Sequence, residues 1–240
     1  MILILCEDSD CSALWAADAL HTRGLSPIVL SDSDLAMVRG WRHTVGAEGV
    51  DFELHLQSGY RVNGREVRGV LNRLAFLPRA WASRIGGADK DYAVQEMQAF
   101  YLSWLHALPG KSLNPPSPQG LCGNFRHPSA WTALACRAGL PVSRFRQTCR
   151  DDPTAFWQTP MEPDAALVLV LGQKVFGPDF LVRSHRRACL QLALDSGCPL
   201  LGIRFEYRPD GIWRFSGATL LPDLRPGGDA LADALAEELS

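Results

Sequence analysis

The chain opens with a strand–helix–strand pattern, and this pattern constrains the fold more than any other stretch of the sequence. The apolar run 2–5 is followed by apolar residues at helical spacing from Leu14 to Leu20, a closing Gly24 and a second apolar run at 27–30. Connections this short favour a parallel βαβ unit, whose ligand-binding edge lies beyond the carboxyl ends of its strands. We therefore expect an α/β protein.

The turn after the first run carries Glu7, Asp8, Ser9 and Asp10 and contains no glycine. A dinucleotide pyrophosphate needs close backbone approach and a positively charged turn, so this is not a Rossmann cofactor site. Asp10 is expected to cap a helix that begins near Cys11, because short acidic side chains accept hydrogen bonds from the first helical amides. Contact between the acidic turn and a substrate amine is the alternative.

The middle of the chain predicts a small hairpin array, a helix and a linker. Alternation at 52–56, two glycine turns and the apolar run 67–74 predict the hairpins. Apolar and aromatic residues then recur in helical steps over 89–105, so this aromatic stripe is expected in the core. Prolines at 115, 116 and 118 exclude regular structure. We therefore divide the chain into domains 1–112 and 113–240.

The second half predicts a further helix and two strand pairs. A helical pattern at 129–138 closes at Gly139, and an apolar hairpin pattern covers 167–176. A helix through Cys189 leads to two more extended segments, 200–203 and 211–215.

The composition argues against two classes of partner, nucleic acid and membranes. A formal net charge of −2 gives no preference for nucleic acid or an anionic membrane, and no apolar stretch is long enough to span a bilayer. The first apolar run ends at Cys6, too short for a secretory signal, so we expect a cytoplasmic protein. Seven cysteines show no CxxC or His-x-Cys spacing, which predicts reduced, mostly buried thiols and no metal site.

Taken in order, several of these stretches resemble glutathione-synthetase-like ATP-grasp ligases, with the ribosomal-peptide-maturing ATP-grasp enzymes the most similar. The stretches that carry the resemblance are 70–74, 96–105, 114–116, 131–142, 167–176, 189–203 and 211–215. The resemblance implies an N-terminal pre-ATP-grasp-like parallel-sheet domain and a reduced, ATP-grasp-like C-terminal α+β half.

The first departure from the family concerns the ATP lid. Family members carry a lysine-bearing strand pair and a glycine-rich loop between the entry segment and the late hairpin. Here residues 151–163 contain three prolines, no lysine and no glycine. Such a segment cannot form a phosphate-cradling loop, so the lid is expected to be shortened and the protein degenerate.

The second departure concerns magnesium. The family pattern places acidic and amide ligands where this chain has Arg204 on one strand and Gly217 and Thr219 on the next. Magnesium needs several oxygen ligands, and an arginine repels it. Glu206 or Asp223 offers a replacement ligand, but Glu206 lies on the same strand face as Arg204, and an ion pair between these two residues is the favoured interpretation.

The resemblance and its departures together predict a non-catalytic accessory subunit, a pseudoenzyme that binds a peptide, protein or carboxylate ligand without a cofactor. The candidate ligand-binding residues are Asn72, Arg73, Arg204 and Glu206; no catalytic or metal-binding residue is expected. Arg204 is interpreted either as one member of a surface ion pair or as an anchor for a partner's carboxylate or phosphate, which its planar guanidinium suits.

The alternative is an ATP-dependent carboxylate–amine ligase that uses ATP and magnesium. Its nucleotide site would be completed by a partner, either a full-length ATP-grasp enzyme or a second copy of this chain in a homodimer. This hypothesis accounts for the persistence of the closing strand pair.

Overall fold

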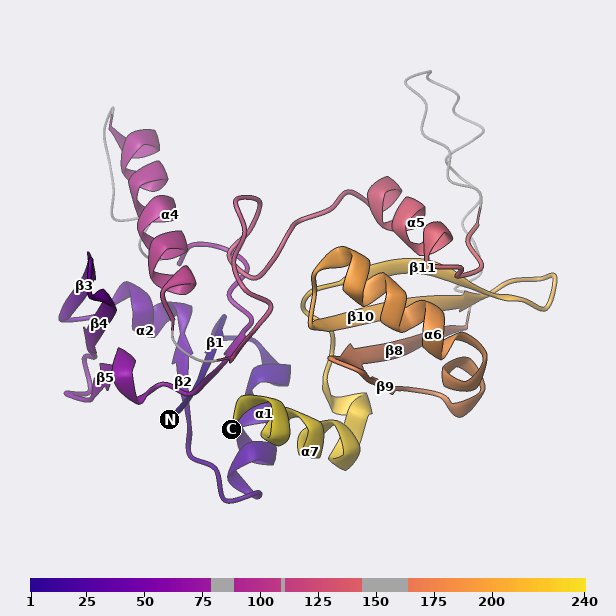
Figure 1. Ribbon diagram of the computed structural model, residues 1–240, viewed down its shortest axis with the longest axis horizontal. Helices are drawn as coiled ribbons and strands as arrows, with labels where there is room; N and C mark the ends of the chain where they lie inside the picture. Colours follow the sequence, from indigo (N-terminus) through magenta and orange to yellow (C-terminus); the bar gives the residue numbers. More distant parts are fainter. Residues whose placement is uncertain (79–88, 109–110, 144–163) are drawn as a thin grey trace.

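The computed structural model describes residues 1–78, 89–108, 111–143 and 164–240, and it consists of two halves, each built on its own sheet (Figure 1). The first half has a four-stranded parallel sheet, β2-β1-β6-β7, and a three-stranded antiparallel sheet, β3-β4-β5. The second half has a four-stranded antiparallel sheet, β11-β10-β8-β9. The expected α/β class, with a parallel sheet first and an α+β half second, is confirmed.

The elements of the first half follow the expected order. Its parallel strands are β1 (Ile2–Cys6), β2 (Pro27–Ser31), β6 (Gly69–Asn72) and β7 (Lys111–Leu113); its antiparallel strands are β3 (Gly40–Gly46), β4 (Gly49–His55) and β5 (Arg61–Asn63); its helices are α1 (Cys11–His21), α2 (Asp32–Ala36), the 3-10 helix η1 (Gly64–Glu66) and α4 (Lys90–His106). The predicted cap of α1 is confirmed, since a carboxylate oxygen of Asp10 accepts from the Ser12 and Ala13 amides at 3.0 Å.

The aromatic stripe of α4 is core, as predicted. Tyr101 and Trp104 are almost fully buried, and the Trp41 ring of β3 meets the Trp104 ring edge-on with centroids 4.7 Å apart. These rings pack α4 onto the antiparallel sheet, and such edge-on pairs add to the stabilisation from burial alone.

One strand was assigned to the wrong sheet. The run 67–74 was predicted to continue the hairpins, but β6 pairs in parallel with β1 and β7, whereas β4 pairs with β3 and β5. All four residues of β6 are buried. A strand covered on both faces has a continuous apolar sequence, which is typical of a parallel sheet rather than a half-exposed hairpin.

The elements of the second half agree with the sequence patterns. Its strands are β8 (Ala165–Leu171), β9 (Lys174–Phe176), β10 (Leu200–Tyr207) and β11 (Trp213–Thr219); its helices are α5 (Pro128–Arg137), α6 (Asp179–Ser196), the 3-10 helix η2 (Arg225–Gly227) and α7 (Gly228–Leu239). Helices α5 and α6 lie on one face of this sheet (Figure 1), where Trp131 and Leu192 pack with Ile203 and Phe205 of β10. None of the helices in the described part of the chain combines the length and apolar character needed to cross a bilayer.

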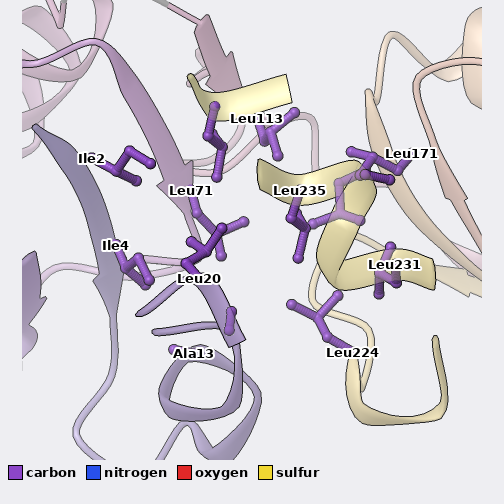
Figure 2. Close-up of a cluster of buried hydrophobic side chains, with 14 of the residues drawn as sticks. Ile2, Ile4, Ala13, Leu20, Leu71, Leu113, Leu171, Leu224, Leu231 and Leu235 are labelled. Atoms are coloured by element: carbon purple, nitrogen blue, oxygen red, sulfur yellow. The ribbon is translucent and has the colours of Figure 1, made fainter. Parts of the chain in front are cut away.

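The last helix, α7, joins the two halves and was not anticipated. Figure 2 shows Leu231 and Leu235 of α7 between Leu71 and Leu20 of the first half and Leu171 of the second. The end of α7 approaches β6 so closely that a Cβ on Gly69 would lie 2.3 Å from the Leu239 carbonyl oxygen. The division at 112/113 falls inside β7, and the chain returns to the first half at its end. The division stays a proposal, but the halves share one core.

The close approach at Gly69 gives a test of this shared core. We expect Gly69→Ala to lower the free energy of unfolding by about 1–3 kcal/mol, because the added methyl forces α7 away from β6. Gly46→Ala is the matched control, since nothing lies within 4 Å of a Cβ at that strand position. Urea denaturation measures both variants, and equal effects would show that α7 does not need this contact.

Candidate ligand-binding site

A cavity of about 760 Å³ lies where the two halves meet. Its walls come from the residues that follow β6, the loop 119–126, the start of α5 and the 216–221 segment of β11 and its continuation. This volume lies in the range typical of ligand pockets. The cavity therefore collects segments that are far apart in the sequence.

The cavity is largely apolar and has exposed aromatic residues in its lining. Phe125 and Phe76 are 76% and 66% exposed, whereas Trp131 of α5 is almost fully buried. Leu220 closes the side next to β11. Large exposed aromatic side chains beside a hollow are typical of sites where an apolar group of a ligand or partner docks.

One cation belongs to this lining. The guanidinium of Arg126 lies 5.2 Å from the centroid of the Trp131 ring, and its Nη2 donates to the Ser196 carbonyl oxygen at 3.0 Å. A guanidinium has five N–H donors, so these contacts orient the group and leave capacity for a carboxylate. The cavity combines apolar walls with a held positive charge.

The loop 119–126 owes its shape to two glycines. A Cβ on Gly120 would lie 2.6 Å from the Gly123 carbonyl oxygen, and Gly123 has a φ of +119°. Neither position accepts a side chain without strain. The two glycines therefore fix the loop that presents Phe125 and Arg126.

Two of the four predicted site residues, Asn72 and Arg73, are buried beside this cavity. Asn72 Nδ2 donates to the carbonyl oxygens of Asn114 and Leu121 at 3.1 and 2.8 Å. Arg73 is 4% exposed; its Nε and Nη2 donate to the two carboxylate oxygens of Asp10 at 2.7 and 3.1 Å, and its Nη1 donates to the Pro222 carbonyl oxygen at 3.1 Å. Both side chains hold the walls of the cavity in position.

Further polar contacts close the same junction. Asn114 Nδ2 donates to the Leu220 carbonyl oxygen at 2.9 Å, and its Oδ1 accepts from the Leu200 amide at 3.1 Å. Asp223 accepts from the Ser12 hydroxyl at 3.1 Å. The hydrogen bonds from the Arg225 side chain to Asp223, with that from Ser12, lower the pKa of Asp223 to about 2. The end of β11 is thus tied to the first sheet.

The other two predicted residues lie on β10. Arg204 is exposed and stands directly opposite Gly217 of β11, while Gly202 stands opposite Thr219. The expected Arg204–Glu206 pair is wrong: Glu206 pairs with Arg208 at 2.8 Å, and the same strand face carries both arginines. Within the described ranges, no ion pair involves Arg204.

The thiols of the described chain are free, and those that are buried have raised pKa values. Cys122 lines the cavity, and burial raises the pKa of its thiol to about 11. Burial likewise raises the pKa of Cys6 and Cys189 to about 12. Cys122 therefore contributes a buried, protonated thiol to the cavity wall. Cys149 lies outside the described residues.

No group of three or more potential metal ligands occurs in the parts of the chain that the structure describes.

Sequence reasoning singled out Gly217 and Thr219, which line the cavity, but it missed the aromatic and cationic residues of the lining. Phe76, Phe125 and Arg126 have no motif around them, and only the glycine-rich turn 120–124 after the proline segment signalled a shaped loop.

Comparison with known proteins identifies the fold. No protein-family model matches the sequence, and no curated protein is significantly similar to it. The macrocyclase MdnC of Microcystis aeruginosa MRC, bound with the precursor peptide MdnA, superimposes with a TM-score of 0.73 at 12% identity over 99% of this chain and 98% of that chain. A RiPP-associated ATP-grasp ligase of Chryseobacterium gregarium, in complex with ADP and a leader and core peptide, gives 0.70 at 11% over 99% and 96%.

A third structure, the D-cycloserine synthetase DcsG, gives a TM-score of 0.53 at 15% identity over the full length of both chains. These likenesses confirm the ATP-grasp-like fold that the sequence resemblance implied. The expected shortening of the lid falls on residues 151–163, which lie outside the described residues, and stays a prediction.

The buried Arg73–Asp10 pair gives a test of the junction beside the cavity. We expect Arg73→Met to lower the free energy of unfolding by about 3–5 kcal/mol, because it leaves a desolvated carboxylate without its partner. Arg42→Met is the control: Arg42 also pairs with a carboxylate, Glu53 at 2.8 Å, but its side chain is 74% exposed, and its loss should cost about 1 kcal/mol or less. Equal losses in urea denaturation would contradict the assigned role of Arg73.

Proposed function

We propose that this chain is a non-catalytic, ATP-grasp-like accessory subunit that binds a peptide, protein or carboxylate ligand in the cytoplasm. The observation that carries the proposal is the pairing of Arg204 with Gly217 across β10 and β11. In the related ligases these strand positions are expected to hold magnesium. Here one offers a cation and the other has no side chain, so this part of the chain does not fit Mg²⁺ with ATP.

The size of the electrostatic repulsion between Arg204 and a magnesium ion supports the proposal. Two like unit charges about 4 Å apart repel by about 4 kcal/mol at the effective dielectric near a protein surface. With no carboxylate pairing Arg204 in the described chain, its charge is available to an anionic ligand instead. Arg204 therefore acts as an anchor for a carboxylate or phosphate, with Glu206 oriented beside it by Arg208.

The cavity at the junction supports a peptide as the ligand. Its apolar walls suit a hydrophobic side chain, and Arg126 suits a neighbouring carboxylate. Two of the similar structures hold precursor peptides. Asn72 and Arg73 contribute by fixing the cavity walls rather than by touching the ligand.

A second candidate function is an ATP-dependent carboxylate–amine ligase whose site for ATP and magnesium is completed by a partner subunit. The complete β8–β9 and β10–β11 pairs favour it, since both pairs belong to the half of the chain that the resemblance assigns to the ATP-grasp domain. A full-length ATP-grasp enzyme, or a second copy of this chain, would supply the missing ligands.

Peptide binding by the cavity is tested with random dodecapeptides displayed on phage. The phage library is first depleted of peptides that bind the double variant Phe76→Ser/Phe125→Ser. Peptides that bind the wild-type chain without ATP are then selected. We expect enriched peptides, and we expect Phe125→Ala to weaken their binding by more than about tenfold in fluorescence anisotropy, because an exposed aromatic anchor is lost.

Tyr92→Ala serves as the control, because Tyr92 is an exposed aromatic residue like Phe125 but lies on α4 outside the cavity lining. Its binding should equal that of the wild type. A selection that enriches no peptide, or peptides that bind the Phe125 variant as well as the wild type, would overturn the proposed function.

A further inference from the structure

The outer edge of β11 is open over a short window that coincides with the cavity. At one end of the window, the Phe215 amide donates to the Pro141 carbonyl oxygen at 2.7 Å, and Val142 forms an isolated parallel bridge with Phe215. At the other end, the Leu220 carbonyl oxygen accepts a hydrogen bond from Asn114 Nδ2. Residues 216–219 between these ends line the cavity.

The ladder between β10 and β11 shows which backbone groups point into the window. Because the Phe215 amide points outward, Phe215 and Phe205 are a non-hydrogen-bonded pair. A bulge then shifts the register, and Arg204 stands opposite Gly217. Alternation makes Ala218 opposite Ile203 the next non-hydrogen-bonded pair, so its N–H and C=O face away from β10.

Ala218 therefore presents one donor and one acceptor toward the cavity. Among the described residues, no backbone group bonds to either across the outer edge. An unpaired donor and acceptor on a strand edge form a template for an extended chain, which adds as a further strand.

Both faces of an added strand would meet a cation. The face toward α5 carries Trp131 and Arg126. The opposite face carries Arg204, and a Cβ at its neighbour Gly217 would have nothing within 4 Å. No side chain at Gly217 stands between Arg204 and the added strand, about 5 Å beyond β11.

From these contacts we infer that the ligand is an acidic, extended peptide segment that pairs with Ala218 at the edge of β11. Its apolar side chain enters the cavity beside Trp131, and its carboxylates meet Arg126 and Arg204. This inference rests on the proposed function and adds to it the binding mode and the charge of the ligand.

The test uses a fluorescein-labelled octapeptide of sequence SEFSEFSE and its counterpart with lysine in place of glutamate, measured by fluorescence anisotropy. We expect the acidic peptide to bind at least about tenfold more tightly than the basic one. Arg126→Gln should reduce this difference, because it removes the cation that faces α5.

Backbone pairing is tested by Ala218→Pro, with Ala218→Ser as the control. The Ala218 amide points away from β10, so proline removes the outward donor without removing a ladder hydrogen bond, and the melting temperature verifies folding. We expect the proline variant to bind the acidic peptide about tenfold or more weakly and the serine variant to match the wild type.

A second measurement tests the backbone pairing without the Ala218→Pro variant. Two versions of the acidic peptide carry backbone N-methyl groups at alternate nitrogens, one version for each edge of the strand. On the wild-type chain, one version should lose about tenfold or more in affinity and the other should bind normally.

Equal binding by both methylated versions, together with full binding by Ala218→Pro, would overturn the strand pairing. Absence of binding by the acidic peptide, or preference for the basic one, would overturn the charge assignment. The phage selection decides the proposed function separately, because it fixes neither the charge nor the backbone conformation of the peptide.

Discussion

The buried pairing of Arg73 with Asp10 is the contact on which the rest of the structure depends. One carboxylate both caps α1 and neutralises a guanidinium that also bonds to Pro222 beyond β11. A buried charge without its partner is costly, so this geometry leaves little freedom between the halves. Asn114 and the apolar face of α7 close the same junction. The parallel sheet and the sheet of the second half are therefore joined through one shared cluster of buried residues.

The cavity follows from that junction. Its walls come from the segment after β6, the 119–126 loop, α5 and β11 with its continuation, and no wall forms a site alone. Asn72 holds the loop at Leu121, and Arg73 and Asn114 hold the segment after β11. Asn72 and Arg73, two of the four residues that the sequence suggested as ligand contacts, thus hold the walls of the cavity. The strand pair supplies the remaining features: Arg204, which has no ion-pair partner among the described residues, and an outer edge at Ala218 with which no described backbone group pairs.

The sequence predicts the local secondary structure but misses contacts between residues that are far apart in the chain. Apolar periodicity locates β1, α1, β2, α4, α5 and the β8–β9 hairpin, and helix-capping chemistry identifies Asp10. The run 67–74 was assigned to a hairpin because alternation does not report which sheet a buried strand joins. The last helix, α7, was missed although Leu231, Leu235 and Leu239 have a four-residue spacing typical of a helix, and their contacts with the first half are not local. Phe76, Phe125 and Arg126 belong to one cavity only after folding, so no spacing rule connects them.

The central claim is that this ATP-grasp-like chain binds its ligand without magnesium and ATP, and a thermal melt of the purified chain tests it most directly. A ligand that binds only the folded state stabilises it by about 2.7 kcal/mol at a hundredfold excess over its dissociation constant. With millimolar ATP, the account predicts the same melting temperature with and without magnesium. A rise that requires magnesium would contradict it and would favour the ligase.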